Sequence, residues 1–192
     1  MIDYFVQDAT IIFMPNLSGQ PKKTNEHMKY ALVLLFIFSG YITSTAQLKT
    51  KPDCGVITVD VYKGWINEAK PNADPEQIKA KLPCFTSSDK EGNESGCGGG
   101  VYYDDKGICF YIQRDYVVIT DAFKGKFTVP VMGAKRDDLF VRFGNAKLKD
   151  ANWEAYQMAF GIMIVYYNMK GVINKVILST KPIEEIDLCN IN

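Results

Sequence analysis

The chain has 192 residues, of which 22 are Lys or Arg and 22 are Asp or Glu, so its formal net charge at pH 7 is zero. This balance excludes the basic excess that attracts nucleic acids or anionic membranes. The one histidine, His27, precedes the segment that we predict to be removed. A mature chain without histidine excludes Ser-His-Asp and Cys-His triads, histidine-ligated zinc and imidazole acid–base catalysis. We expect no metal and no cofactor.

Residues 28–46 have the three parts of a secretory signal peptide. Lys29 precedes an apolar run over residues 31–38, and the small residues Ser44 and Ala46 stand at the −3 and −1 positions of a cleavage site. The apolar run is shorter than the roughly 20 residues of a membrane span. A membrane anchor is therefore the weaker alternative to a cleaved signal peptide.

Residues 1–27 are best explained as an over-extended start, with Met28 as the true initiator. Residues 47–192 then remain as one exported domain, periplasmic or extracellular, with no stable membrane span after cleavage. This length is sufficient for a hydrophobic core. The removed part holds three lysines and three acidic residues, so the mature chain stays neutral.

Two stretches of this domain align with each other at an offset of 61 residues. VITVDVYKGWIN, which starts at Val56, lies on VVITDAFKGKFT, which starts at Val117. The register continues without a gap, so that Ile78 meets Leu139. Because a chance motif would not carry the following apolar positions with it, the alignment favours a duplication.

Each copy predicts a strand, a Lys-Gly turn, a short helix and hairpin strands. The first helix follows Asp74 as N-cap, and the second covers residues 135–143. The repeats span about residues 56–120 and 116–180, so the strand at 116–120 belongs to both. We predict an α+β fold in which two tandem helix-plus-hairpin units share one antiparallel sheet of about eight strands, with the helices on one face.

The Lys-Gly step itself occurs at Lys63 and again at Lys124. A functional lysine has little reason to appear twice. We therefore interpret both lysines as exposed turn residues and the motif as a mark of duplication.

Five cysteines lie in the mature chain, which predicts disulfides for an exported protein. Cys84 and Cys97 bracket an inserted loop rich in Ser, Gly and charged residues, and a bond between them would clamp it. Cys54 and Cys189 flank the first and last strands and could tie the two ends together. Cys109 is then a buried thiol, while a bond between Cys97 and Cys109 is an open alternative.

Acidic pairs at residues 104–105, 137–138 and 184–185 are the candidates for carboxylate chemistry. Each pair is expected in a turn, a helix start or the tail, where solvated carboxylates are ordinary. An enzyme that uses carboxylates or an activated Cys109 is therefore the alternative to a binding protein. A purely structural envelope protein is a third possibility.

The predicted strands at residues 108–112 and 161–167 are apolar on both faces. Helices can cover only one face of the sheet. The other face is either covered by the terminal segments and the inserted loop, or it is an aromatic surface for a partner.

RDDLFVRFG, from Arg136, leads into WEAYQMAFGIMIVYY around Trp153. Two tandem units with these motifs resemble the β-lactamase-inhibitor-protein fold and the related small lipoproteins of the outer-membrane barrel assembly machinery, over about residues 56–180. Members of this group bind proteins or lie in the bacterial envelope, and the inhibitors use aromatic residues of the sheet face. The resemblance implies Tyr111, Trp153 and Tyr167 as binding residues. We expect an exported, non-enzymatic binding protein whose partner is a protein or another envelope component.

Overall fold

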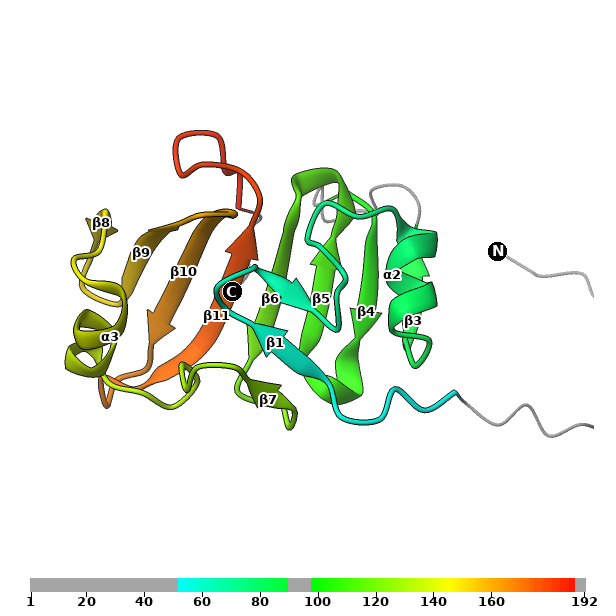
Figure 1. Cartoon of the computed structure of the whole chain (residues 1–192), viewed down its shortest axis with the longest axis horizontal. Helices are drawn as coiled ribbons and strands as arrows, with labels where there is room; N and C mark the ends of the chain where they lie inside the picture. The colour runs from blue at the N-terminus through cyan, green and yellow to red at the C-terminus, as the bar shows by residue number, and fades with distance from the viewer. Residues whose placement is uncertain (1–51, 90–97, 189–192) are drawn as a thin grey trace, which may run out of the picture. The chain divides into compact units, whose positions relative to one another are not determined.

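Eight antiparallel strands form one sheet in the order β3-β4-β5-β6-β11-β10-β9-β8 (Figure 1). The computed structural model describes residues 52–89 and 98–188, so the predicted start segment and the predicted signal peptide lie outside the described residues. The strands are β3 (Ser87–Asp89), β4 (Gly100–Tyr103), β5 (Ile108–Tyr111), β6 (Tyr116–Thr120), β8 (Leu148–Lys149), β9 (Trp153–Met158), β10 (Gly161–Tyr167) and β11 (Ile173–Ser179). The predicted α+β class and the antiparallel sheet of eight strands are confirmed.

The sheet consists of two four-stranded meanders that meet at β6 and β11. These strands pair antiparallel, from Thr120 with Lys175 to Tyr116 with Ser179. One meander follows helix α2 (Pro75–Lys81), and the other follows helix α3 (Arg136–Phe143). Among the described residues, neither helix has the length and the apolar character to cross a bilayer.

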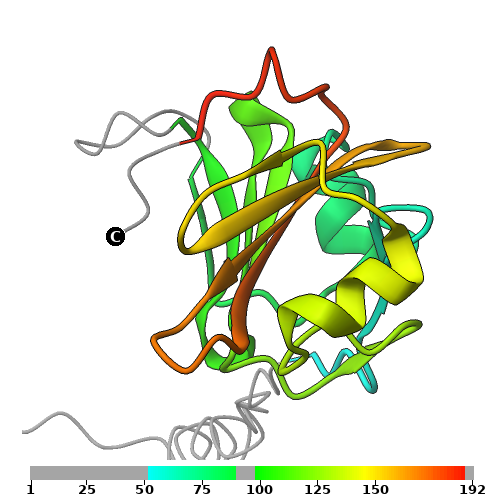
Figure 2. The ribbon, with the colours of Figure 1, turned by 90° about the vertical axis from the view of Figure 1, so that its left-hand side faces the viewer.

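Both helices lie on the same side of the sheet, as predicted (Figure 2). Each helix turns one apolar residue into the same core, Ile78 from α2 and Leu139 from α3, and both are fully buried. Asp74 precedes α2 with extended backbone and Pro75 takes the first helical position. At the start of α3, the carboxylate of Asp138 accepts the backbone N–H of the N-cap residue at 3.0 Å.

A second, three-stranded sheet of β1 (Thr58–Asp60), β2 (Trp65–Ile66) and β7 (Lys126–Phe127) lies on the helix side. Here β1 pairs antiparallel with β2 and parallel with β7. The offset of 61 residues places β1 on the end of β6, yet these two strands lie in different sheets. The two tandem units therefore stay a prediction, because alternation identifies a strand but not its partner.

The face opposite the helices carries a second, smaller core. Tyr116, Ile162 and Ile177 are buried there. The C-terminal segment, residues 180–188, covers part of this face through its apolar residues, which are Ile183, Ile186 and Leu188. The sequence left two alternatives for this face: coverage by the chain itself, or an aromatic surface for a partner. The structure shows partial coverage by the chain's own C-terminal segment.

Three ion pairs hold the C-terminal segment against the sheet. Lys181 lies 3.3 Å from Asp115, Glu184 lies 2.6 Å from Lys147, and Asp187 pairs with Arg114. Such surface pairs contribute little individually. Their placement at both sides of the segment nevertheless defines its path over the sheet.

The disulfide of the described chain joins Cys54 to Cys84, with a Cα–Cα distance of 5.4 Å. The predicted bonds from Cys84 to Cys97 and from Cys54 to Cys189 are therefore wrong, since each uses a cysteine that is already paired. The reason is the fold: Cys54, shortly before β1, lies beside Cys84, shortly after α2, although thirty positions separate the two cysteines. Cys97 and Cys189 lie outside the described residues, and Cys109 is a half-buried free thiol.

Candidate functional site

The three predicted binding residues do not share one surface. Tyr111 in β5 and Trp153 in β9 both belong to the face opposite the helices, but β6, β11 and β10 lie between them. At the usual strand spacing this separates the two side chains by about 19 Å. Tyr167 points to the helix side, where it is 8 % exposed in the main core. Its neighbour Tyr166 is the one that shares the face of Trp153, its cross-strand partner.

Tyr111 lies within a row of tyrosine rings rather than on an open surface. Its ring centroid is 4.8 Å from that of Tyr116 and 6.5 Å from that of Tyr102. Tyr116 is fully buried. Burial is the largest cause that raises the pKa of the Tyr111 hydroxyl well above its usual value. These rings stabilise the second core.

Cys109 lies beside this row, and its thiol lacks the lowered pKa of an activated cysteine. Burial raises its pKa to about 12. A nucleophilic cysteine instead needs a lowered pKa, so that the thiolate is present near neutral pH.

On the helix side, Tyr167 belongs to a closed network around a buried carboxylate. Glu154, the second residue of β9, is 5 % exposed. Its Oε2 accepts hydrogen bonds from the hydroxyls of Tyr156 at 2.6 Å and Tyr167 at 2.7 Å. Its Oε1 lies 3.0 Å from Nε of Arg136. The carboxylate is thus neutralised and fully hydrogen-bonded, which burial of a charge requires.

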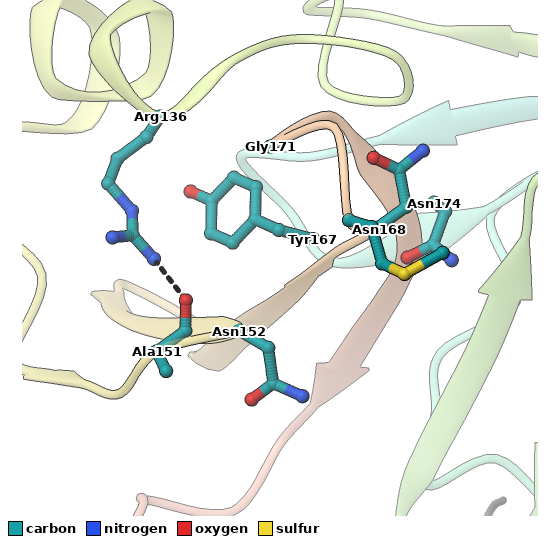
Figure 3. Close-up of a pocket in the computed structure, with 8 residues that line it drawn as sticks. Arg136, Ala151, Asn152, Tyr167, Asn168, Gly171 and Asn174 are labelled. Atoms are coloured by element: carbon teal, nitrogen blue, oxygen red, sulfur yellow. Dashed lines mark hydrogen bonds between the residues drawn. The ribbon is translucent and has the colours of Figure 1, made fainter.

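Arg136 ties the first turn of α3 to the start of β9. Its guanidinium lies 4.7 Å from the ring centroid of Tyr167, a cation–π contact. Its Nη2 donates to the backbone carbonyls of Asp150 and Ala151, both at 3.3 Å. Figure 3 shows the Arg136 side chain reaching from α3 toward the tyrosine ring, with the bond to Ala151 dashed.

A cavity of about 720 Å³, the Arg136 pocket, opens beside this network at the end of the β10–β11 hairpin (Figure 3). Its lining residues are Arg136, Ala151, Asn152, Tyr167, Asn168, Met169, Gly171 and Asn174.

Three asparagines supply the polar groups of the Arg136 pocket. Oδ1 of Asn168 accepts the backbone N–H groups of Lys170 at 2.9 Å and Val172 at 3.1 Å, which leaves its NH₂ group available. Within residues 52–89 and 98–188, the side chains of Asn152 and Asn174 make no hydrogen bond. The pocket therefore offers amide donors and acceptors above a floor whose one positive charge is already paired.

The sequence prediction found one member of this site, Tyr167, and missed Arg136, Glu154 and the three asparagines. A signal for Glu154 was present, because an acid that lies between Trp153 and Ala155 in a strand of the core needs a partner when it is buried. The acidic pairs that the sequence singled out do not meet. Asp105 pairs with Lys106, and the other pairs serve the start of α3 and the C-terminal segment.

Among the described residues, no group of His, Cys, Asp and Glu side chains is arranged to hold a metal ion. No protein-family model, curated protein or solved structure matches the chain. The function is therefore argued from the geometry of the site.

Proposed function

We propose that the chain is an exported, non-enzymatic binding protein of the bacterial envelope, which holds an uncharged polar group of its ligand in the Arg136 pocket. The observation that carries the proposal is the combination of a neutralised floor, Arg136 with Glu154, and a rim of available asparagine amides. Pockets of this size with a few convergent polar groups are the usual form of ligand sites.

The ionisable groups of the pocket favour binding over acid–base catalysis. Burial, followed by the hydrogen bond to Glu154, raises the pKa of Tyr167 to about 12, and the same two causes raise that of Tyr156 further. A general acid or base works best with a pKa near the operating pH. Both phenols instead serve as fixed donors to the carboxylate.

The polar rim favours an uncharged ligand. An anionic ligand would compete with Glu154 for Arg136. A cationic ligand would lie beside the positive guanidinium, and the carboxylate of Glu154 is already paired. Asparagine side chains both donate and accept, so they match hydroxyl or amide groups. Met169, fully exposed at the hairpin tip, adds an adaptable apolar contact.

The Cys54–Cys84 bond supports the exported location, because disulfides persist in oxidising compartments. We also propose that the fold arose by tandem duplication. Pro75 and Arg136, which the 61-residue offset aligns, both start a helix that precedes a four-stranded meander.

The proposal is tested by NMR titration of ¹⁵N-labelled residues 47–192 with size-fractionated envelope extract. We expect one fraction to shift the side-chain amide signals of Asn152, Asn168 and Asn174. An Asn152→Ala, Asn174→Ala double variant should lose this response, and Tyr111→Ala should keep it.

Shifts confined to Tyr111 and Trp153 would overturn the pocket and identify the sheet face opposite the helices as the binding surface. Conversion of an extract component into a new species would identify an enzyme. A response that survives the double variant, or no response at any fraction, would contradict the proposed site.

A further inference from the structure

The two Lys-Gly turns, which the sequence aligns, differ in structure. Gly64 has a φ of +69°, whereas the φ of Gly125 is not positive. Tyr62 is 56 % exposed, but Phe123 at the aligned position is 7 % exposed. The residue after the glycine is Trp65 in the first turn and a lysine in the second. The first turn thus presents aromatic surface that the second lacks.

A groove of about 420 Å³, the Trp65 groove, runs beside the first turn. It is lined by Tyr62, Lys63, Trp65, Lys70, Asn72, Ala159, Phe160 and Thr180. Aromatic rings, two lysines, one amide and one hydroxyl therefore surround a single small space, which shares no residue with the Arg136 pocket.

Positive charge is in excess at this groove. Nζ of Lys63 lies 5.2 Å and Nζ of Lys70 lies 5.6 Å from the Trp65 ring centroid. Lys63 is 3.8 Å from Oδ2 of Asp60, whose Oδ1 already accepts two backbone N–H groups of the turn. In the described chain, Lys70 forms no ion pair. Glu68 is also nearby: its pKa is lowered mainly by Lys81, with which it pairs at 2.9 Å, and to a smaller extent by Lys63. Because that carboxylate is taken by Lys81, only Asp60, at the limit of an ion pair, faces the ammonium groups of Lys63 and Lys70 directly.

Close packing fixes the aromatic wall of the groove. A Cβ atom at Gly64 would lie 2.4 Å from the ring of Phe160, so only glycine allows this approach. The same glycine donates its N–H to the carbonyl of Asp60 at 2.8 Å. The turn and the Phe160 ring are therefore held against each other.

A two-residue turn over residues 66–69 sets Trp65 opposite Lys70. Its central residues, Asn67 and Glu68, have φ values of 45° and 66°, the left-handed pair that a tight hairpin requires. Asparagine tolerates this conformation, but glutamate rarely adopts it, so the turn carries backbone strain at Glu68. Residues held in such conformations cluster at binding sites, where they fix side chains before a ligand arrives.

We propose that the Trp65 groove binds an acidic sugar, a saccharide that carries a carboxylate or a phosphate. The sugar packs against the side chains of Trp65 and Tyr62, and its anionic group pairs with Lys63 and Lys70, whose ammonium groups lie over the Trp65 ring when no ligand is bound. Asn72 and Thr180 provide hydrogen-bonding partners for hydroxyl groups. The volume suits one or two sugar rings and is within the range of small-ligand sites.

The fluorescence of Trp65 gives a direct test. The chain has two tryptophans, so Trp153→Phe leaves Trp65 as the sole indole reporter. Trigalacturonate supplies the carboxylated probe, glucose 6-phosphate the phosphorylated probe, and galactotriose the neutral counterpart. We expect a saturable change with at least one acidic probe, and the probe that saturates at the lower concentration identifies the anion. The neutral sugar should bind about tenfold more weakly.

Substitutions distinguish recognition of the sugar's anionic group from nonspecific shielding of the Trp65 indole. Lys70→Gln should weaken binding of the acidic probe by about tenfold, and Lys70→Arg should retain it. Lys124→Gln, in the second Lys-Gly turn, is the matched control and should bind like the parent. These lysines are exposed, so thermal unfolding followed by circular dichroism should coincide for all variants.

Several outcomes would overturn the acidic-sugar site. They are no saturation with either acidic probe, equal affinity for galactotriose, an unchanged affinity in Lys70→Gln, or tighter binding of a triglutamate peptide. Because the Arg136 pocket shares no residue with the groove, none of these results bears on the proposed function.

Discussion

Arg136 covers Glu154: its Nε lies 3.0 Å from a carboxylate oxygen that is otherwise closed off from solvent. The guanidinium itself is partly exposed, with 46 % of the side chain accessible. The pair therefore joins the buried core of the sheet to the surface at the start of α3. Removal of the outer partner leaves the inner charge without compensation.

We expect Arg136→Met to lower the free energy of unfolding by about 2 kcal/mol, less than for a fully buried pair because the arginine is partly solvated. Arg142→Met, on the same helix and exposed, is the control and should change stability by less than about 0.5 kcal/mol. Urea unfolding measures both. Equal stabilities of the two variants would show that Arg136 does not compensate Glu154.

The strained turn beside the Trp65 groove predicts a stabilising substitution. Glu68→Gly should raise the free energy of unfolding by about 0.5 kcal/mol, because glycine adopts the φ of 66° without the Cβ clash. The ion pair from Glu68 to Lys81, which the substitution also removes, is exposed and screened by solvent. Asn67→Gly should instead destabilise, since Oδ1 of Asn67 accepts the N–H of Thr58 at 2.8 Å. Two variants that shift stability in the same direction would contradict the assignment.

The helices and the side-chain alternation of the strands could be predicted from the sequence. An apolar residue repeated at the right spacing located both helices, with Ile78 and Leu139 as their buried residues. Alternation along residues 161–167 also puts the adjacent Tyr166 and Tyr167 on opposite faces, which is where the structure has them. The expectation that Tyr167 shares the face of Tyr111 and Trp153 came instead from the resemblance to β-lactamase-inhibitor proteins. The resemblance itself stays a prediction.

Long-range pairing could not be predicted, because periodicity holds no information about which elements meet. The parallel pairing of β1 with β7 and the Cys54–Cys84 bond depend on how the segment before α2 folds onto the core. The candidate site has the same origin. Arg136, Glu154 and the β10–β11 hairpin converge only once α3 packs on the sheet.

The disulfide makes a prediction that peptide mapping can check. Non-reducing digestion should yield a peptide that joins Cys54 to Cys84. The Cys54→Ala, Cys84→Ala double variant should lose about 3.6 kcal/mol of unfolding free energy, from the loop of thirty residues that the bond closes. A peptide that joins Cys84 to Cys97 would contradict the structure and restore the clamped-loop prediction.

Burial of Cys109 predicts a loss of stability at alkaline pH. Its pKa is about 12 in the folded chain against 9.0 in the unfolded chain, so the folded state retains a proton that the unfolded state has released between these values. Because the folded state then binds more protons, the free energy of unfolding falls as pH rises from about 9 toward about 12. At pH 10, one unit above the unfolded value, the thiol should account for a loss of about 1 kcal/mol relative to pH 8. Urea unfolding at both pH values should show a smaller loss for Cys109→Ala than for the parent, and an equal loss would mean that the thiol is solvated and available to react.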